Sequence, residues 1–502
     1  MAVSVRKNIV ANILGKLWGF VSVFIFVPIY ISLLGLESYG VISFYAMLLS
    51  FLAFADAGLT ATLSREFAKA DIECPDYKQN LLRTIEYVYI GIGFFIILLT
   101  TIFADTIVAN FIKSDVIPFG DLVAHVRIMG IIIFLSLTCS LYQGGLMGLQ
   151  RQVLSNCISI LYNIVRSAVV LIPLIWISDL YFYFYWQLVA SILYLFILRY
   201  FLLKYIKVNK PIKASINYLK GIWKYALGMM IMAIIASVNT QIDKLVVSKM
   251  LTLVDFTNYS LSSMVSQVIL FFATPIAIAM FPELTRLISI KADTQAKLFF
   301  HKYSFIIAMV SSAIASVLIC YAYSYILIWT QDSSIASVID LPTKVLIVGC
   351  LFLSIQFCPY YLSLANGHTR TNIIFGILTI FCVVPMLILF VAKLGLIGAT
   401  VSWLVINVLA TFTLGFILIN KFMKGEFTKW LLFDTILPLG VSLAIGFVFW
   451  CLFSELPKGL LTILYGLVIF LVIMLINGII FLKRYPEYKQ NKYIKKIVLI
   501  RR

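Results

Sequence analysis

One long apolar stretch of the sequence, Gly221 to Met250, carries Asn239, Gln241, Asp243 and Lys244 in its second half. An ionised side chain near a bilayer centre costs roughly 2.5–3.5 kcal/mol on insertion scales, so it is retained mainly where it faces other helices or water. We therefore expect this stretch to form a helix that lines a polar passage, with Asn239, Asp243 and Lys244 in contact with a transported substrate. The alternative is that Asp243 and Lys244 only cap the outer end of the helix.

A second polar stripe runs along the apolar segment that begins near Gln152. Asn156, Ser159, Asn163 and Arg166 occur at i, i+3, i+7 and i+10, which places them on one side of a helix. By helical rise, Arg166 lies roughly 20 Å from the predicted cytoplasmic end. We expect Asn163 and Arg166 to line the same passage. The alternative is a structural Arg166 that is hydrogen-bonded to backbone carbonyls.

Two further charged residues fall inside the first two predicted spans. Lys16 and Asp56 each lie roughly 10 Å from the cytoplasmic ends of antiparallel helices, so they could pair. Such a pair would either fix the packing of these helices or take part in transport. Asp243 or Asp56 could also bind an ion, H⁺ or Na⁺, and couple transport to a gradient.

No cofactor or metal site is expected. The three histidines are scattered through the chain, and the eight cysteines form no CxxC pair. We interpret the cysteines as buried apolar side chains.

The composition excludes an ordinary soluble domain, because 62% of the residues are hydrophobic and 12% are charged. A membrane-spanning helix needs about 20 mostly apolar residues. We therefore predict an all-α polytopic membrane protein with about fourteen transmembrane helices. The apolar windows begin near Ile9, Ser38, Thr84, Leu122, Gln152, Leu180, Ile222, Phe256, Leu298, Leu341, Thr371, Gly395, Trp430 and Leu460.

The basic residues explain the net charge of +18 without nucleic acid as a partner. Most of the 39 Lys and Arg residues fall in segments that are cytoplasmic if the N-terminus is inside, and the outer loops hold only Lys113, Lys249, Lys393 and Lys458. This asymmetry follows the positive-inside rule. It predicts that both termini are cytoplasmic.

The order of the windows predicts a two-part plan. We expect a six-helix bundle over residues 1–203, a basic cytoplasmic linker over 204–220 and a second six-helix bundle over 221–427. An additional helix pair over 428–483 and a basic tail over 484–502 would follow. Repeats of this kind place the substrate site at their interface.

Two acidic residues are interpreted as interfacial. Glu86 falls near the start of one predicted span, and Asp434 lies only a few residues into another. Side chains at such positions can reach the polar membrane surface. We therefore give neither residue a role in the passage.

Four stretches together resemble the Wzx-type O-antigen and polysaccharide flippases, in the superfamily that also holds MATE-type drug transporters and lipid II flippases. They are LLGLESYGVISFY, FADAGLTATLSREFAKA, NTQIDKLVVSKMLTLVDFTNYSLSS and MFPELTRL. The resemblance implies transport, without catalysis, of an undecaprenyl-pyrophosphate-linked oligosaccharide for O-antigen or lipopolysaccharide biosynthesis. It also implies the bacterial inner membrane as the location. The partners it implies are the lipid-linked oligosaccharide, membrane lipids, and a polysaccharide polymerase with its chain-length machinery.

The residues fit this chemistry independently, because cations in a cavity can neutralise a pyrophosphate that cannot cross hydrocarbon unaided. Lys16, Arg166 and Lys244 are the predicted cations. Three alternatives stay open: a lipid II-type flippase, a MATE-like drug antiporter, and a membrane glycan polymerase or glycosyltransferase. An antiporter for cationic drugs would need acidic residues in the passage to bind the drug. A polymerase would generally need a large outer loop or paired carboxylates.

Overall fold

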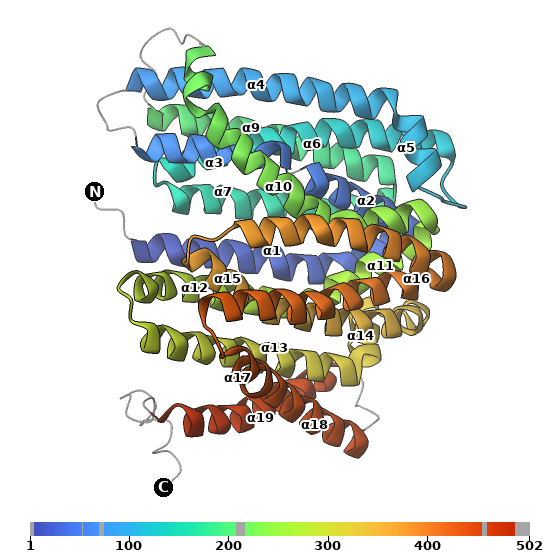
Figure 1. Cartoon of the computed structure of the whole chain (residues 1–502). Coiled ribbons are helices and arrows are strands. Elements are labelled where there is room, and N and C mark those ends of the chain that lie inside the picture. The colour runs from blue at the N-terminus through green and yellow to red at the C-terminus, as the bar shows by residue number, and fades with distance from the viewer. Residues whose placement is uncertain (1–4, 53, 70–74, 207–215, 454–458, 487–502) are drawn as a thin grey trace. The chain divides into compact units, whose positions relative to one another are not determined.

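A computed structural model of the chain describes residues 5–52, 54–69, 75–206, 216–453 and 459–486 (Figure 1). Every regular element within these ranges is a helix. Eleven of the described helices are long and apolar enough to cross a membrane. The prediction of an all-α polytopic membrane protein is therefore confirmed.

The chain divides into two compact units, Met1–Thr257 and Asn258–Arg502. The first unit holds α1 (Val5–Leu34), α2 (Leu36–Leu52), α3 (Phe54–Lys69), α4 (Pro75–Ile102), α5 (Ala104–Phe111), α6 (Phe119–Gly148), α7 (Gln152–Ile164), η1 (Val165–Val169), α8 (Leu171–Ile177), α9 (Leu180–Ile206) and α10 (Ile216–Met250). The helix α11 (Leu253–Ser266) contains the division. The second unit continues with α12 (Val268–Ser289), α13 (Asp293–Thr330), α14 (Ser333–Ile355), α15 (Phe357–Ala365), α16 (Arg370–Phe422), α17 (Phe427–Lys429), η2 (Trp430–Ile436), α18 (Leu437–Leu452) and α19 (Leu460–Arg484).

This division differs from the predicted boundary at residues 204–220. The difference comes from α10, which packs along α3 and α2 and is therefore grouped with the first unit. The plan of two six-helix bundles and an additional pair remains a prediction.

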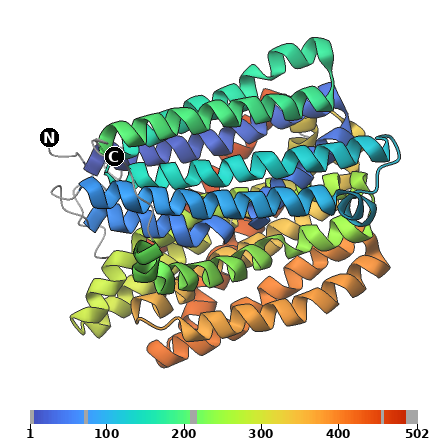
Figure 2. The same cartoon turned by 90° about the horizontal axis from the view of Figure 1, so that it is seen from above.

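In the first unit, α6 is the helix around which several others pack. It contacts α3, α4 and α9, and Figures 1 and 2 show α4 and α6 running side by side. The glycines of α6 allow the close approach, because a Cβ on Gly148 would lie 2.6 Å from the carbonyl oxygen of Ser64. A Cβ on Gly145 would lie 2.8 Å from a methyl group of Leu202 on α9. Small residues commonly bring membrane helices together in this way.

In the second unit, the core forms between α12 and α13. A stripe of buried side chains on α12 repeats every three to four residues, as a helix packed along one face requires. It comprises Ile269, Ala273, Ala277, Met280, Leu284 and Leu287. Phe300 and Ile307 of α13 belong to the same core.

The 53-residue helix α16 contains two of the predicted spans. As one straight helix it would measure about 80 Å, far longer than the roughly 30 Å hydrocarbon core. Gly395 interrupts it with φ 57° and ψ −133°, a conformation available essentially to glycine. Gly398 then packs against the preceding half, since an added Cβ would lie 2.0 Å from the carbonyl oxygen of Phe390. These two glycines separate α16 into two spans.

We expect Gly398→Ala to lower stability by about 2 kcal/mol or more, because the new methyl group would overlap backbone atoms that cannot rotate away. The unfolding midpoint of the detergent-purified protein measures this. Gly440→Ala on α18 is the matched control, because nothing lies within 4 Å of its added Cβ. Alanine should there raise stability slightly through helix propensity. Equal midpoints for the two variants would contradict the expectation.

The last two spans, α18 and α19, pack on α13 (Figure 1). Val317 and Tyr321 of α13 form a buried cluster with Ile469 and Ile473 of α19. Buried polar side chains add hydrogen bonds between these helices, centred on the Ser442 hydroxyl. Its partners are Ser312 Oγ at 2.8 Å and Asn477 Nδ2 at 3.0 Å.

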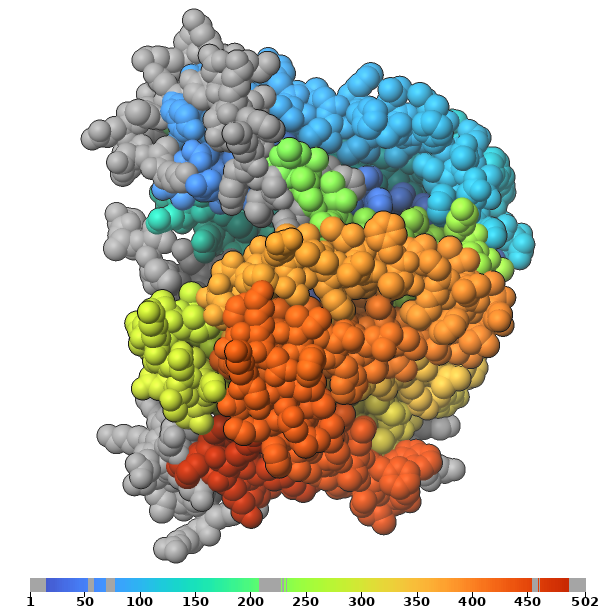
Figure 3. All heavy atoms as spheres, in the orientation of Figure 1, coloured from blue at the N-terminus to red at the C-terminus, as the bar shows by residue number. Residues whose placement is uncertain are grey.

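Large apolar side chains are exposed along α16 and α18, which Figure 3 shows as the orange surface of the second unit. They include Phe381, Leu389, Phe416 and Phe447. An exposed apolar surface of this kind fits hydrocarbon.

Candidate functional site

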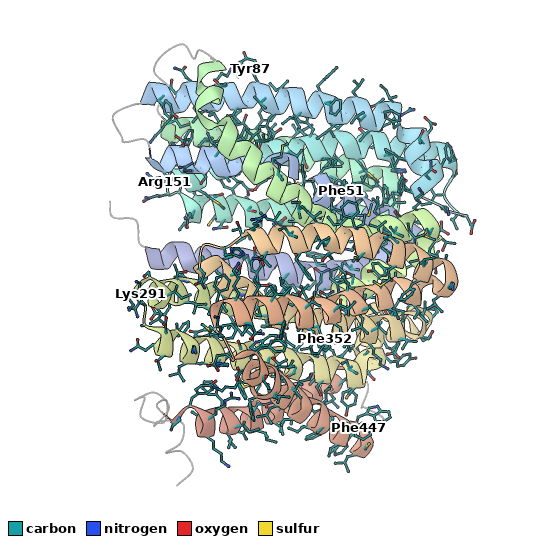
Figure 4. The ribbon with its side chains drawn as sticks, in the orientation of Figure 1. Phe51, Tyr87, Arg151, Lys291, Phe352 and Phe447 are labelled. Carbon is teal, nitrogen blue, oxygen red and sulfur yellow. The ribbon has the colours of Figure 1, made fainter. Side chains whose placement is uncertain are left out.

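The helix that carries the predicted residues Asn163 and Arg166 is interrupted by a π-helical turn. α7 runs directly into η1, and α8 continues after it. Arg151, labelled in Figure 4, precedes α7, and its guanidinium lies 4.4 Å from the ring centroid of Tyr205 on α9. A π turn contains an extra residue and is frequent at functional sites. Arg166 is the charged residue of this turn.

Side chains from neighbouring helices satisfy the backbone of the π turn. The carbonyl oxygens of residues 165, 166 and 167 each accept a hydrogen bond from a side chain. The donors, in that order, are Trp186 Nε1 at 3.0 Å, Gln187 Nε2 at 3.1 Å and Tyr30 Oη at 2.8 Å. A π turn with three such partners is held in place by α1 and α9.

The guanidinium of Arg166 is oriented by the same glutamine. Its Nε donates to Gln187 Oε1 at 2.6 Å, and its Cζ lies 5.8 Å from the ring centroid of Tyr45 on α2. The tyrosines whose hydroxyls interact electrostatically with it are Tyr30, Tyr45, Tyr162 and Tyr183. In the part of the chain that the structure describes, no carboxylate forms an ion pair with Arg166. Arg166 is thus a half-buried cation among neutral hydroxyls.

A polar and aromatic group continues from Arg166 along α7. The rings of Tyr162 and Tyr194 stack with their centroids 4.0 Å apart. The hydroxyl of Tyr162 is 3.0 Å from Ser191 Oγ, and Gln143 on α6 donates to the hydroxyl of Tyr194. These contacts join α7 to α9, and α9 to α6, on the side where Arg166 follows.

The structure separates Lys16 from this site. Gly15 of α1 packs against Asn156 of α7, whereas Tyr30 of the same helix reaches the π turn. By helical rise, Lys16 is therefore about 15 Å from the level of Arg166. Its side chain is exposed. The side chain of Asp56, its predicted partner, lies outside the described residues.

The predicted residues of α10 form a second group. Asp243 is buried, whereas Asn239 and Lys244 are half-buried. Asn239 Nδ2 donates to the carbonyl of Ile235 one turn earlier, at 2.9 Å. α10 packs along α3, the helix on which Asp56 lies, and α2 contacts α10 while Tyr45 of α2 faces Arg166. The seven predicted residues thus fall into separate parts of the first unit, and their role as a site remains a prediction.

The interfacial interpretation of Glu86 is wrong. Its side chain is buried, and its carboxylate accepts a hydrogen bond from Tyr142 Oη at 2.7 Å. Arg83 and Arg199 form ion pairs with it at 3.0 and 3.3 Å. Arg199 and Tyr142 are distant in sequence, so the local pattern could not indicate the pairing.

Within the described residues, no group of three or more His, Cys, Asp or Glu side chains could hold a metal ion. The expectation that the protein uses no cofactor stays a prediction.

Several residues at the site were not identified from the sequence, chiefly Tyr30, Tyr45, Trp186 and Gln187. Gln187 had one usable signal, since it is a polar residue within an apolar span, as Arg166 is. Nothing in the local sequence indicates the π turn that these side chains stabilise.

Comparison with known proteins gives the family. Residues 5–288 match the profile of a family described as "Polysaccharide biosynthesis protein". This chain belongs to that family. A search of curated proteins by sequence found no match.

The fold of this chain is similar to the folds of solved transporters. The "Lipid II flippase MurJ, inward closed conformation" shares 15% identity, covering 95% of this chain and 99% of that one, with a TM-score of 0.74. An inward-facing MATE family multidrug resistance transporter of the MOP superfamily shares 16%, covering 83% and 96%, with a TM-score of 0.63. The Vibrio cholerae MATE transporter VcmN in its bent form shares 14%, covering 85% and 98%, with a TM-score of 0.53. The predicted resemblance is confirmed: the chain belongs to a polysaccharide biosynthesis family and shares its fold with a lipid II flippase and MATE transporters.

Proposed function

We propose that this protein is a flippase for an undecaprenyl-pyrophosphate-linked oligosaccharide, an O-antigen or related polysaccharide unit, in the bacterial inner membrane. The family description supports a role in polysaccharide biosynthesis. The shared fold with a lipid II flippase supports lipid-linked cargo. The observation that carries the proposal is the guanidinium of Arg166, which is oriented by Gln187 and has no carboxylate partner among the described residues.

A guanidinium in this setting suits pyrophosphate. Arg presents several N–H donors in a planar fork that matches phosphate oxygens, and it is less strongly hydrated than an ammonium group. Gln187 engages Nε, and no described residue forms a hydrogen bond with the two terminal nitrogens of Arg166, so these can bind a ligand. Charge-assisted hydrogen bonds of this kind are roughly twice as strong as neutral ones.

The same observation disfavours a cationic-drug antiporter. A cationic drug would be repelled by Arg166, whereas an anionic head group would be attracted to it. A glycan polymerase or glycosyltransferase is disfavoured by the fold shared with a flippase and a transporter, so we propose that the protein is not an enzyme.

We further propose that transport proceeds by alternating access with both termini cytoplasmic. Asp243 or Asp56 would couple it to H⁺ or Na⁺. A polysaccharide polymerase and its chain-length machinery would act on the exported unit.

Reconstituted vesicles test the proposal directly. Purified protein is incorporated with a fluorescent undecaprenyl-pyrophosphate oligosaccharide, and the fraction of label accessible to a membrane-impermeant quencher is followed over time. The expected result is transfer between leaflets with an unchanged oligosaccharide length. A longer or shorter oligosaccharide would indicate an enzyme, and unchanged leaflet distribution in vesicles that hold folded protein would contradict the flippase.

A further inference from the structure

The second unit holds a buried charged cluster that the proposed transport does not use. We define the His301 cluster as His301 of α13, Glu426 before α17, Asp434 of η2, Arg484 of α19 and Lys297 of α13. The interfacial interpretation of Asp434 is therefore wrong, because its side chain is fully buried. The π turn η2 places Asp434 against α13, and its partners come from distant parts of the sequence.

His301 lies between two carboxylates. Its Nδ1 contacts Asp434 Oδ2, and its Nε2 is 3.3 Å from Glu426 Oε2. A neutral imidazole has one N–H donor, and its other nitrogen is an acceptor. With both carboxylates ionised, a neutral His301 would therefore face one carboxylate oxygen with a lone pair.

Each carboxylate has a cation beside it. Arg484 Nη2 lies 2.9 Å from Asp434 Oδ1. Lys297 and Lys429 lie 3.2 and 3.0 Å from Glu426. Burial raises the pKa of Glu426, but its contacts with Lys429, Lys297 and His301 lower this pKa by a larger amount. The pKa of Glu426 therefore lies below its ordinary value. Two carboxylates that are each paired with a cation accept best from an N–H on each ring nitrogen of His301.

We propose that His301 holds a resident proton, as a buried imidazolium that locks the C-terminal helix pair α18–α19 onto α13. The imidazolium donates to η2 on one side and to the segment before α17 on the other. Arg484 extends the same network to α19. If the proton is lost, one of the two contacts becomes repulsive, so the helix pair is held less firmly.

Other charged or titratable groups face this cluster from the elements packed around it. They are Cys358 of α15, Lys429 of α17 and Tyr485 after α19. Lys302 of α13 and Glu283 and Arg286 of α12 line a neighbouring pocket with Tyr485. Glu283 and Arg286 pair with each other at 2.6 Å. Replacing His301 alone removes the imidazole and leaves these groups in place, so a change in pH dependence can be assigned to His301.

Histidine NMR tests the proton directly, because the chain has only three histidines. In protein labelled with ¹⁵N-histidine at neutral pH, the signal that disappears in His301→Gln should have the pattern of an imidazolium with both nitrogens protonated. Glu426→Gln should return His301 to a neutral tautomer. A neutral pattern for His301 in the wild-type protein would overturn the proposal, and this readout is independent of transport.

The lock is tested by the pH dependence of stability. Since the folded state holds the proton, its stabilisation is present at low pH and is lost as alkali removes it. The wild-type unfolding midpoint should fall by several degrees over the pH range in which the imidazolium signal disappears. His301→Gln should lack this step. An identical step in both proteins would mean that the proton does not hold the helix pair.

Discussion

Arg166→Ala will reduce transport of the lipid-linked oligosaccharide roughly 10- to 100-fold, if the guanidinium contacts pyrophosphate during transfer. Hydrogen bonds to charged groups contribute about 1.5–3 kcal/mol, and each 1.4 kcal/mol corresponds to about a factor of ten. The vesicle assay with fluorescent substrate measures the rate. Arg166→Lys keeps the charge but loses the planar fork, so we expect an intermediate rate.

The control for Arg166 is another arginine of the first unit. Arg127 is half-exposed and lies 3.7 Å from Asp105, so Arg127→Ala removes a weak surface pair and should leave transport unchanged. Arg166→Ala also leaves Gln187 Oε1 without its donor, so rates are compared at equal amounts of folded protein. Wild-type transport by folded Arg166→Ala would exclude a role for Arg166 in binding the head group.

Asp434→Ala will destabilise the second unit by about 3–5 kcal/mol, the usual cost of removing one partner from a buried ion pair. It would leave the buried His301 and the half-buried Arg484 without the carboxylate that both contact. Thermal unfolding in detergent measures the loss. Poor recovery of folded protein would agree with it.

Asp293→Ala is the matched control for Asp434→Ala. Asp293 is an exposed acidic residue in the first turn of α13 and interacts mainly with the helix dipole. Its removal should cost less than about 1 kcal/mol. Equal losses for the two variants would show that the buried contacts of Asp434 contribute nothing to stability.

Hydropathy was enough to predict the class of fold, because each helix in a bilayer must satisfy its own backbone and therefore needs a long apolar sequence. The window that begins near Ser38 falls on α2, which at 17 residues is too short to count among the eleven candidate spans. The windows that begin near Thr371 and Gly395 share α16.

The errors concern charged residues near the ends of spans. Glu86 and Asp434 were interpreted as reaching the membrane surface, yet each is buried with cations from helices far away in sequence. A local pattern indicates distance from a helix end but not the partner across a helix interface. The two π turns were also not predicted, and one of them carries Arg166 while the other carries Asp434.

The π turn η1 has a consequence for changes in chain length. A turn that already holds one residue in excess can lose it and become a regular α-helix, with its backbone hydrogen bonds intact. Because the wider π turn takes up the extra residue, the helix before and after the deletion would keep nearly the same faces toward their neighbours. Single-residue length variation at positions 165–169 is therefore a route by which related chains can keep the span and its packing faces and yet lose the wide turn that carries the cation.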